Sequence, residues 1–378
     1  MAVKTLPRHP VYPLLHFLRK NPVLTAAVFA ASVTACIVPP DRAYLDYFDW
    51  KTLTCLFSTL AVVCALRNIR FFTILAQRIV RRFSDLRSVT AALVCITFIG
   101  SMFIANDMAL LTFLPLGWFV LSMTGKRERM AYVFILQNIA ANLGGMLTPF
   151  GNPQNLYLYT KFAIPNLEFM RVMFLPFALA VTLILLCCLR LPREPLTVEN
   201  EPASLPPART AAYLALFALT VVMVFRVLPY PIGGGIVLLA LLFLDRDALR
   251  RVDYPLLLTF AAFFVFSGNM ARIPAVRALF AAIPERFTLP VSVLSCQLIS
   301  NVPTAVLLSQ FTANWRSLLI GVNIGGTGTL IASLASLITF REYNTRCPGH
   351  TGAYIRLFSV MNFGFLGILL AFSLLLGF

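Results

Sequence analysis

Asn142-Leu-Gly-Gly-Met-Leu-Thr-Pro-Phe-Gly-Asn-Pro-Gln-Asn155 interrupts a segment that otherwise has the composition of a membrane helix. Its three glycines and two prolines leave several backbone N–H and C=O groups without helical partners. Such groups are costly in hydrocarbon, so this sequence is tolerated only against other protein or a water-filled cavity. Asn152 as N-cap, followed by Pro153 in the first turn, favours a new helix start. The stretch predicts a broken helix that contributes to a ligand site.

The composition of the whole chain is that of a polytopic membrane protein. Of its 378 residues, 59% are hydrophobic and 12% are charged, whereas soluble domains carry about 25% charged residues. The net charge of +16 would suit a nucleic-acid partner. The cations, however, lie in short loops between apolar segments, as the positive-inside rule requires. Neither a nucleotide-binding loop, a metal-ligand cluster nor a Ser/His/Asp set is present, so we expect neither an enzyme nor a nucleic-acid-binding protein.

The apolar segments predict an all-α fold. The expected membrane spans are residues 22–39, 52–67, 130–163 (broken), 172–190, 209–228, 231–244, 254–269, 316–342 (broken) and 353–377. The distribution of Lys and Arg places the N-terminal segment 1–21 of this multi-pass protein in the cytoplasm.

Two further apolar stretches, 88–123 and 288–313, are predicted to form re-entrant helical hairpins. The first has arginines or lysines at both ends, so both ends belong on the cytoplasmic side. Its polar pair, Asn106 and Asp107, lies at the middle of the stretch and predicts a hairpin tip near the midplane. The second stretch starts and ends on the outer side, so this hairpin is expected to enter from the opposite face.

The two halves of the chain carry matching interruptions. Ile104-Ala-Asn-Asp resembles Ile299-Ser-Asn-Val, and Asn142-Leu-Gly-Gly resembles Asn323-Ile-Gly-Gly. The sequence predicts an inverted repeat of residues 22–190 and 231–378, joined by a cytoplasmic linker and a connecting span in 191–230. Matched interruptions in oppositely inserted halves indicate the midplane site of a transporter. The alternative is a pair of packing kinks left by gene duplication, without a ligand.

Two amphipathic segments, 71–83 and 273–283, precede the predicted hairpins. Their apolar and basic faces predict helices that lie in the membrane interface. Each is alternatively an extension of a span with a solvated charged face.

Four helix starts are expected to meet at the site. Asn106 or Asp107 is predicted to cap the returning helix of the first hairpin, Ser300 and Asn301 that of the second, and Asn152 and Ser333 the helices after the two breaks. A helix N-terminus carries roughly +0.5 charge and free N–H donors, so opposed N-termini favour an anion. The candidate substrate-binding residues are Asn106, Thr148, Asn152, Asn155, Ser300, Asn301, Thr304, Thr329 and Ser333. The hydroxyls of Thr148 and Thr329 could instead satisfy helix carbonyls.

Asp107 is the only carboxylate that this topology places inside the membrane, where ionisable groups are usually functional. It is a candidate cation ligand or protonatable coupling group, or a simple N-cap. Carbonyl groups freed by the two breaks are candidate ligands for Na⁺. The candidate coupling-ion residues are Asp107, Asn106, Gly144, Gly145, Asn301, Gly325 and Gly326. No other metal or cofactor is expected.

These motifs resemble those of the ion transporter superfamily, which includes arsenite permeases, citrate–metal symporters and divalent anion/sodium symporters. Asn106-Asp-Met-Ala-Leu-Leu-Thr-Phe-Leu-Pro115 is similar to the first-hairpin motif of the arsenite and citrate branches. Ser300-Asn301 is similar to the hairpin tip of the divalent anion branch, although Val302 replaces a threonine. The short bacterial anion permeases of the superfamily are the most similar members. The resemblance implies hairpin-bearing units that move against a scaffold, elevator fashion, often in a homodimer.

Together with the resemblance, these observations predict a secondary active transporter of a bacterial inner membrane that carries a small carboxylate or oxyanion and is coupled to Na⁺ or H⁺. The alternatives are efflux of a metalloid such as arsenite, or cation/proton exchange at Asp107.

Overall fold

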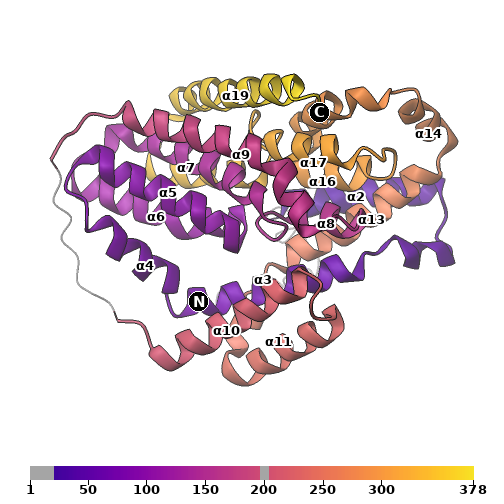
Figure 1. Ribbon diagram of the computed structural model, residues 1–378, viewed down its shortest axis with the longest axis horizontal. Helices are drawn as coiled ribbons and strands as arrows, with labels where there is room; N and C mark the ends of the chain where they lie inside the picture. Colours follow the sequence, from indigo (N-terminus) through magenta and orange to yellow (C-terminus); the bar gives the residue numbers. More distant parts are fainter. Residues whose placement is uncertain (1–20, 196–203) are drawn as a thin grey trace, which may run out of the picture.

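The computed structural model describes residues 21–195 and 204–378, which form an assembly of helices without an extended β-strand (Figure 1). Predictions for residues 1–20 and for the linker segment 196–203 lie outside the described residues. The elements of the first half are α2 (Pro22–Ile37), η1 (Arg42–Tyr47), α3 (Trp50–Asn68), α4 (Phe71–Val80), α5 (Leu86–Ile104), α6 (Asn106–Met123), η2 (Arg127–Arg129), α7 (Met130–Gly144), η3 (Gly145–Leu147), α8 (Pro153–Lys161) and α9 (Asn166–Leu189).

After the linker the chain continues through another set of helices. These elements are α10 (Pro207–Val224), α11 (Tyr230–Leu244), α12 (Arg246–Arg250), α13 (Tyr254–Arg272), α14 (Pro274–Ala281), η4 (Glu285–Phe287), α15 (Thr288–Ile299), α16 (Asn301–Leu308), α17 (Trp315–Ile324), α18 (Leu334–Arg346) and α19 (Thr351–Leu375). In the described residues, eight helices are long and apolar enough to cross a membrane. The chain is therefore a multi-pass membrane protein.

Both predicted hairpins are pairs of helices joined at a single residue. Ala105 (φ 62°) joins α5 to α6, and Ser300 (φ 74°) joins α15 to α16. A positive φ is uncommon for residues with a side chain, and here it reverses the chain without a loop. Ala105 therefore occupies the N-cap position of α6. The prediction that Asn106 or Asp107 caps this helix is wrong, because both already lie in its first turn.

The two ends of each hairpin lie together. At the base of α5–α6, Arg87 donates a 2.7 Å hydrogen bond to the Leu191 carbonyl, and Lys126 pairs with Glu194. At the base of α15–α16, the hydroxyls of Thr288 and Thr312 are 3.3 Å apart. Each of the two stretches thus enters and leaves the helix assembly at one end.

The two hairpin bases lie at opposite ends of α9. Leu191, which contacts the first base, follows directly after α9, whereas Glu168 in the first turn of α9 pairs with Arg316 near the second base. At 1.5 Å per residue, the 24 residues of α9 span roughly 36 Å. The hairpins therefore approach the middle of the molecule from opposite ends.

The two predicted broken spans are broken in the structure. α7 ends at Gly144, and the chain resumes as α8 at Pro153; α17 ends at Ile324 and α18 begins at Leu334. The two caps differ from each other. The Ser333 hydroxyl accepts the Ala335 N–H, as predicted, whereas the side chain of Asn152 occupies the N-cap position without capping the helix. Packing against the second half takes the Asn152 amide elsewhere, as described below.

The helices that form the hairpins and the broken helices lie beside a second group of helices, which includes α3, α10 and α11. In Figure 1, α5, α6, α7 and α9 form one body, with α3, α10 and α11 along the opposite edge. α13 packs along α2 and touches α16, and the predicted amphipathic segments are the short helices α4 and α14. This arrangement brings both hairpin tips against the wall formed by α2 and α13.

Candidate functional site

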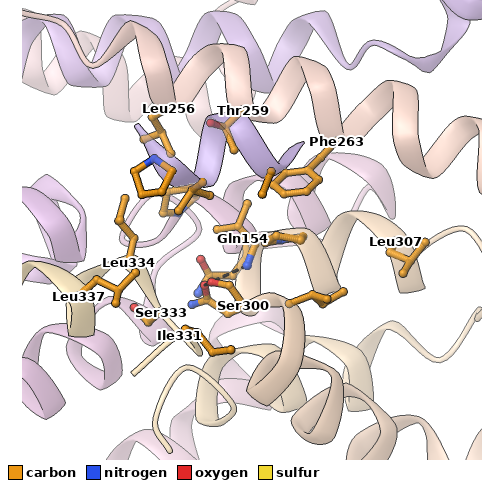
Figure 2. A pocket seen from close by; sticks show the side chains of 18 of the residues that line it. Gln154, Leu256, Thr259, Phe263, Ser300, Leu307, Ile331, Ser333, Leu334 and Leu337 are labelled. Carbon is orange, nitrogen blue, oxygen red and sulfur yellow. Dashed lines mark hydrogen bonds between the residues drawn. The ribbon is translucent and has the colours of Figure 1, made fainter. Parts of the chain in front are cut away.

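A cavity of about 520 Å³ lies where the first turns of four helices meet (Figure 2). Its polar wall comes from the starts of α6, α8, α16 and α18. The lining residues at these starts are Asn106, Asp107, Pro153, Gln154, Ser300, Asn301, Val302, Pro303, Ser333 and Leu334. α2 and α13 complete the cavity with a largely apolar wall that includes Ala26, Ala30, Leu256, Thr259 and Phe263. The predicted convergence of helix starts is therefore present.

The starts of four helices lie at the wall of the cavity, so the positive ends of four helix dipoles are near it. In three of these helices a first-turn N–H is already bonded to a side-chain oxygen: Asp107 N–H to Asn106, Val302 N–H to Asn301, and Ala335 N–H to Ser333. Among the described lining residues there is no Lys, Arg or His, and Asp107 is the only ionisable side chain. In such a site an anion can interact with helix dipoles and neutral hydrogen-bond donors, and a cation can interact with one carboxylate.

Asn142, near the end of α7, connects three of these elements. Its Oδ1 accepts hydrogen bonds from Asn106 Nδ2 (3.1 Å) and from the Ser333 hydroxyl (2.7 Å). Its own Nδ2 donates to the Asn138 carbonyl at 3.2 Å. Asn142 is only 2% exposed, so water cannot take its place as hydrogen-bond acceptor for Asn106 and Ser333. This side chain therefore holds the first hairpin tip in register with the second broken helix.

A reciprocal contact runs from the first break to the second. Asn152 Nδ2 donates to Asn323 Oδ1 at 3.3 Å, and Asn323 Nδ2 donates to Asn155 Oδ1 at 2.6 Å. Asn323 occupies in α17 the position that Asn142 occupies in α7. Each break is thus anchored to the helix that precedes the other break, which couples the two halves at the cavity.

The unwound backbone is held by side-chain amides. Asn155 Nδ2 donates to the carbonyls of Gly145, Met146 and Thr148 (3.0–3.3 Å). In the second break, Gln297 Nε2 donates to the carbonyls of Gly325 (2.9 Å) and Thr327 (3.1 Å). These bonds satisfy carbonyl groups that lost their helical partners, which explains why the interruptions are tolerated.

Two buried oxygen atoms of residues that line the cavity, Asp107 Oδ1 and Gln154 Oε1, have no hydrogen-bond donor among the described residues. Gln154 is 1% exposed and lies near the centre of the cavity wall, between Ser300 and Phe263 in Figure 2. Buried acceptors of this kind are usually paired. These two oxygens are therefore free to accept a hydrogen bond or to bind a cation at the cavity wall.

The structure brings together only part of the predicted site. Asn106, Asp107, Ser300, Asn301 and Ser333 line the cavity. Behind the wall lie Thr148, Asn152, Asn155, Thr304, Thr329, Gly144, Gly145, Gly325 and Gly326.

The hydroxyls of two of these threonines make equivalent contacts. Thr148 donates to the Met102 carbonyl (2.9 Å) and Thr329 to the Gln297 carbonyl (3.1 Å). The two hydroxyls thus satisfy helix carbonyls, which was the predicted alternative to substrate binding. Met102 and Gln297 each lie four residues before the asparagine of their hairpin tip. In both halves, therefore, the broken helix holds the entering arm of the hairpin in the same way.

Sequence reasoning missed Gln154, Asn142 and Gln297. Gln154 and Asn142 lie inside the stretch that directed attention to the site, and their polar side chains next to a break were the available signal. Gln297 lies in the entering arm of the second hairpin. Its Oε1 accepts a hydrogen bond from the N–H of Thr329, which is 32 residues later in the chain. No local pattern marks that contact.

Gly144→Ala is expected to destabilise the protein. A Cβ at Gly144 would lie 2.3 Å from the Phe98 carbonyl oxygen and 2.4 Å from the Ser101 hydroxyl, so α5 and α7 would have to separate. Overpacking of this kind costs about 1–3 kcal/mol, and thermal unfolding in detergent should show a lowered Tm. Gly364→Ala in α19 is the matched control, because nothing lies within 4 Å of its added Cβ. Equal melting temperatures for both variants would contradict the tight α5–α7 contact.

Comparison with known proteins adds the following. The family model described as a citrate transporter matches residues 14–315. An uncharacterized transporter of Methanocaldococcus jannaschii is 32% identical over 297 residues, which cover 78% of this chain and 82% of that protein. The inner membrane protein YbiR of Escherichia coli is 29% identical over 309 residues, with 79% and 81% covered. A silicon efflux transporter of Oryza sativa is 29% identical over 184 residues, 48% of this chain and 36% of that protein.

Proposed function

Because the chain belongs to the citrate transporter family, we propose that it is a secondary active transporter of a small carboxylate or oxyanion. The family and the relatives are transporters rather than enzymes, and this chain is a membrane transporter. The observation that carries the choice of an anion is the convergence of four helix N-termini on one cavity whose described lining includes no cationic side chain. Dipoles and N–H donors bind an anion strongly enough to hold it and weakly enough to release it.

The coupling ion is proposed to be Na⁺ or H⁺, bound at Asp107. The carboxylate lines the cavity, and its Oδ1 is buried without a donor. A buried carboxylate that lacks a partner is costly when charged, so it favours uptake of a cation or a proton. Asn106 and Asn301 at the hairpin tips, which also line the cavity, complete the set of proposed ion ligands. The carbonyls of Gly145 and Gly325 are instead bonded by Asn155 and Gln297, and neither these two glycines nor Gly144 and Gly326 line the cavity.

The transport cycle is proposed to be an elevator movement of two inverted repeats that carry re-entrant hairpins. The positions of the hairpin bases at opposite ends of α9 support inversion. Equivalent contacts of Thr148 and Thr329 support a repeat. The N-terminus and the base of the first hairpin are assigned to the cytoplasm, in accordance with the positive-inside rule.

A homodimer is the proposed assembly, and light scattering of the purified protein in detergent measures its mass.

Cysteine labelling tests the proposed re-entrance. With the exposed native Cys36 changed to Ala, a cysteine at Thr124 should react only with reagent on the cytoplasmic side. A cysteine at Ala313, after the second hairpin, should react only from the outer side. Each residue lies at the base of its hairpin, Thr124 directly after α6 and Ala313 between α16 and α17. Labelling of both positions from one side would overturn the inverted arrangement.

Flux into proteoliposomes tests the proposed substrate class. The purified protein is reconstituted and given a panel of carboxylates and oxyanions under separately imposed Na⁺ and pH gradients. Accumulation of an anion in response to one gradient is the expected result. Movement of Na⁺ against H⁺ without any cargo would instead establish cation/proton exchange.

A second candidate is transport of a neutral, hydroxyl-bearing metalloid acid. The unpaired acceptors of Gln154 and Asp107 at the cavity wall favour a ligand that donates hydrogen bonds. The similarity to a protein named as a silicon efflux transporter points in the same direction. In the same liposomes, flux of arsenite or silicic acid without flux of carboxylates would replace the first proposal by this one.

A further inference from the structure

An apolar groove of about 300 Å³ lies apart from the candidate site, between α4, the first hairpin and α10. α4 contributes Phe71, Phe72, Leu75, Ala76 and Ile79 to its wall, and the facing helices contribute Leu66, Ile96, Ile99, Gly100, Phe103, Phe113, Leu214 and Phe217. The groove opens at the surface of the protein, because the side chains of Leu75, Ile99 and Phe103 are 45%, 54% and 43% exposed. In Figure 1, α4 lies between the hairpin helices α5 and α6 and the connecting helix α10.

Three arginines lie at the C-terminal end of α4, next to this groove. Arg78, Arg81 and Arg82 are exposed, and none of them forms an ion pair with a described residue. Arg78 is three residues after Leu75 in α4, so these two side chains are neighbours on the helix surface. Arg81 and Arg82 follow directly after Val80, the last residue of α4. The negative end of the helix dipole also favours positively charged side chains near the C-terminus of α4.

We propose that the groove and the arginines together form a binding site for an anionic phospholipid. One acyl chain lies in the groove, against side chains that offer it only apolar surface. The phosphate is bound by the guanidinium groups of Arg78, Arg81 and Arg82, which suit phosphate oxygens in geometry and charge. The lipid contacts the hairpin and α10 at once, so it links the hairpin-bearing body to the helices beside it.

The site is tested by native mass spectrometry of the full chain taken from nanodiscs that contain equal amounts of phosphatidylglycerol and phosphatidylcholine. The wild-type protein should retain phosphatidylglycerol in preference. The triple variant R78Q/R81Q/R82Q should lose this preference by at least about fivefold, since the three groups act on one phosphate. The triple variant R246Q/R341Q/R356Q removes the same charge from other exposed positions and should retain the preference. Equal loss in both triple variants would show general attraction to anionic lipid and would overturn the proposal.

The groove is tested separately. Leu75→Trp places a large ring in the groove and should reduce the retained phosphatidylglycerol while the arginines remain. Leu239→Trp is the control, because Leu239 is an exposed residue of α11 (58%) outside this groove. Undiminished retention in Leu75→Trp would overturn the placement of the acyl chain. A melting temperature measured for every variant shows whether any loss of lipid reflects unfolding. None of these readouts depends on the proposed transport activity.

Discussion

Asp107→Asn is expected to abolish ion-driven accumulation of the cargo while the protein remains folded. Asparagine keeps the size of the side chain but cannot lose a proton or give a full charge to a cation. The carboxylate lines the cavity and forms no ion pair with a described residue, so the substitution breaks none there. The ratio of internal to external cargo, measured under an imposed Na⁺ or pH gradient, should fall to about one, the value for uncoupled transport.

Exchange measurements separate coupling from binding in this variant. Counterflow of labelled against unlabelled cargo needs no net ion movement, and it should continue in Asp107→Asn. Asp247→Asn is the matched control, because Asp247 is an exposed carboxylate on α12, where it pairs with Arg250. Accumulation in Asp107→Asn equal to that of this control would remove Asp107 from the coupling mechanism.

Asn142→Ala is expected to weaken cargo binding and lower stability together. The substitution removes the shared acceptor of Asn106 and Ser333 and leaves both buried donors unpaired. Each unpaired buried group costs about 1–3 kcal/mol. The hairpin tip and the start of α18 would then no longer be joined through one side chain. The dissociation constant of the cargo should therefore rise at least about tenfold.

Binding by isothermal titration and thermal unfolding measure the two effects of Asn142→Ala. Asn344→Ala is the control, since Asn344 bonds only to Thr351 among the described residues and lies far along α18 from the cavity. Ser333→Ala removes one of the two donors and should give a smaller loss than Asn142→Ala. Affinity unchanged in Asn142→Ala would mean that the cavity keeps its shape without this contact.

The parts of the fold that follow from local chemistry could be predicted from the sequence. The stretch that interrupts the helix after Gly144 contains two prolines, which lack a helical N–H donor, and the break after Ile324 contains Gly325, Gly326 and Gly328, which lower the stability of a helix. The hairpin around Asn106 was predicted because the charges at its ends and the polar pair at its middle constrain a stretch of known length. Single residues such as Ala105, with its positive φ, carry no sequence signal of the turn they make.

Which polar side chains face the cavity could not be predicted in this way. Asn152 was expected to cap α8, and its N-cap position is correct, but its amide instead bonds to Asn323, 171 residues later. Gln154 adjoins the same break and was not selected, yet it lines the cavity that Thr148 and Thr329 do not reach.

The sequence by itself determined the all-helical membrane architecture, the two interruptions and the positions of the polar hairpin tips. Those features depend on backbone hydrogen bonding and charge within a few residues of one another. The tertiary structure alone decided the network centred on Asn142 and the presence of the unpaired oxygens of Asp107 and Gln154 at the cavity wall. A one-residue rotation of a helix, about 100°, turns a side chain from the cavity to the core. That rotation is fixed by packing between helices far apart in the chain.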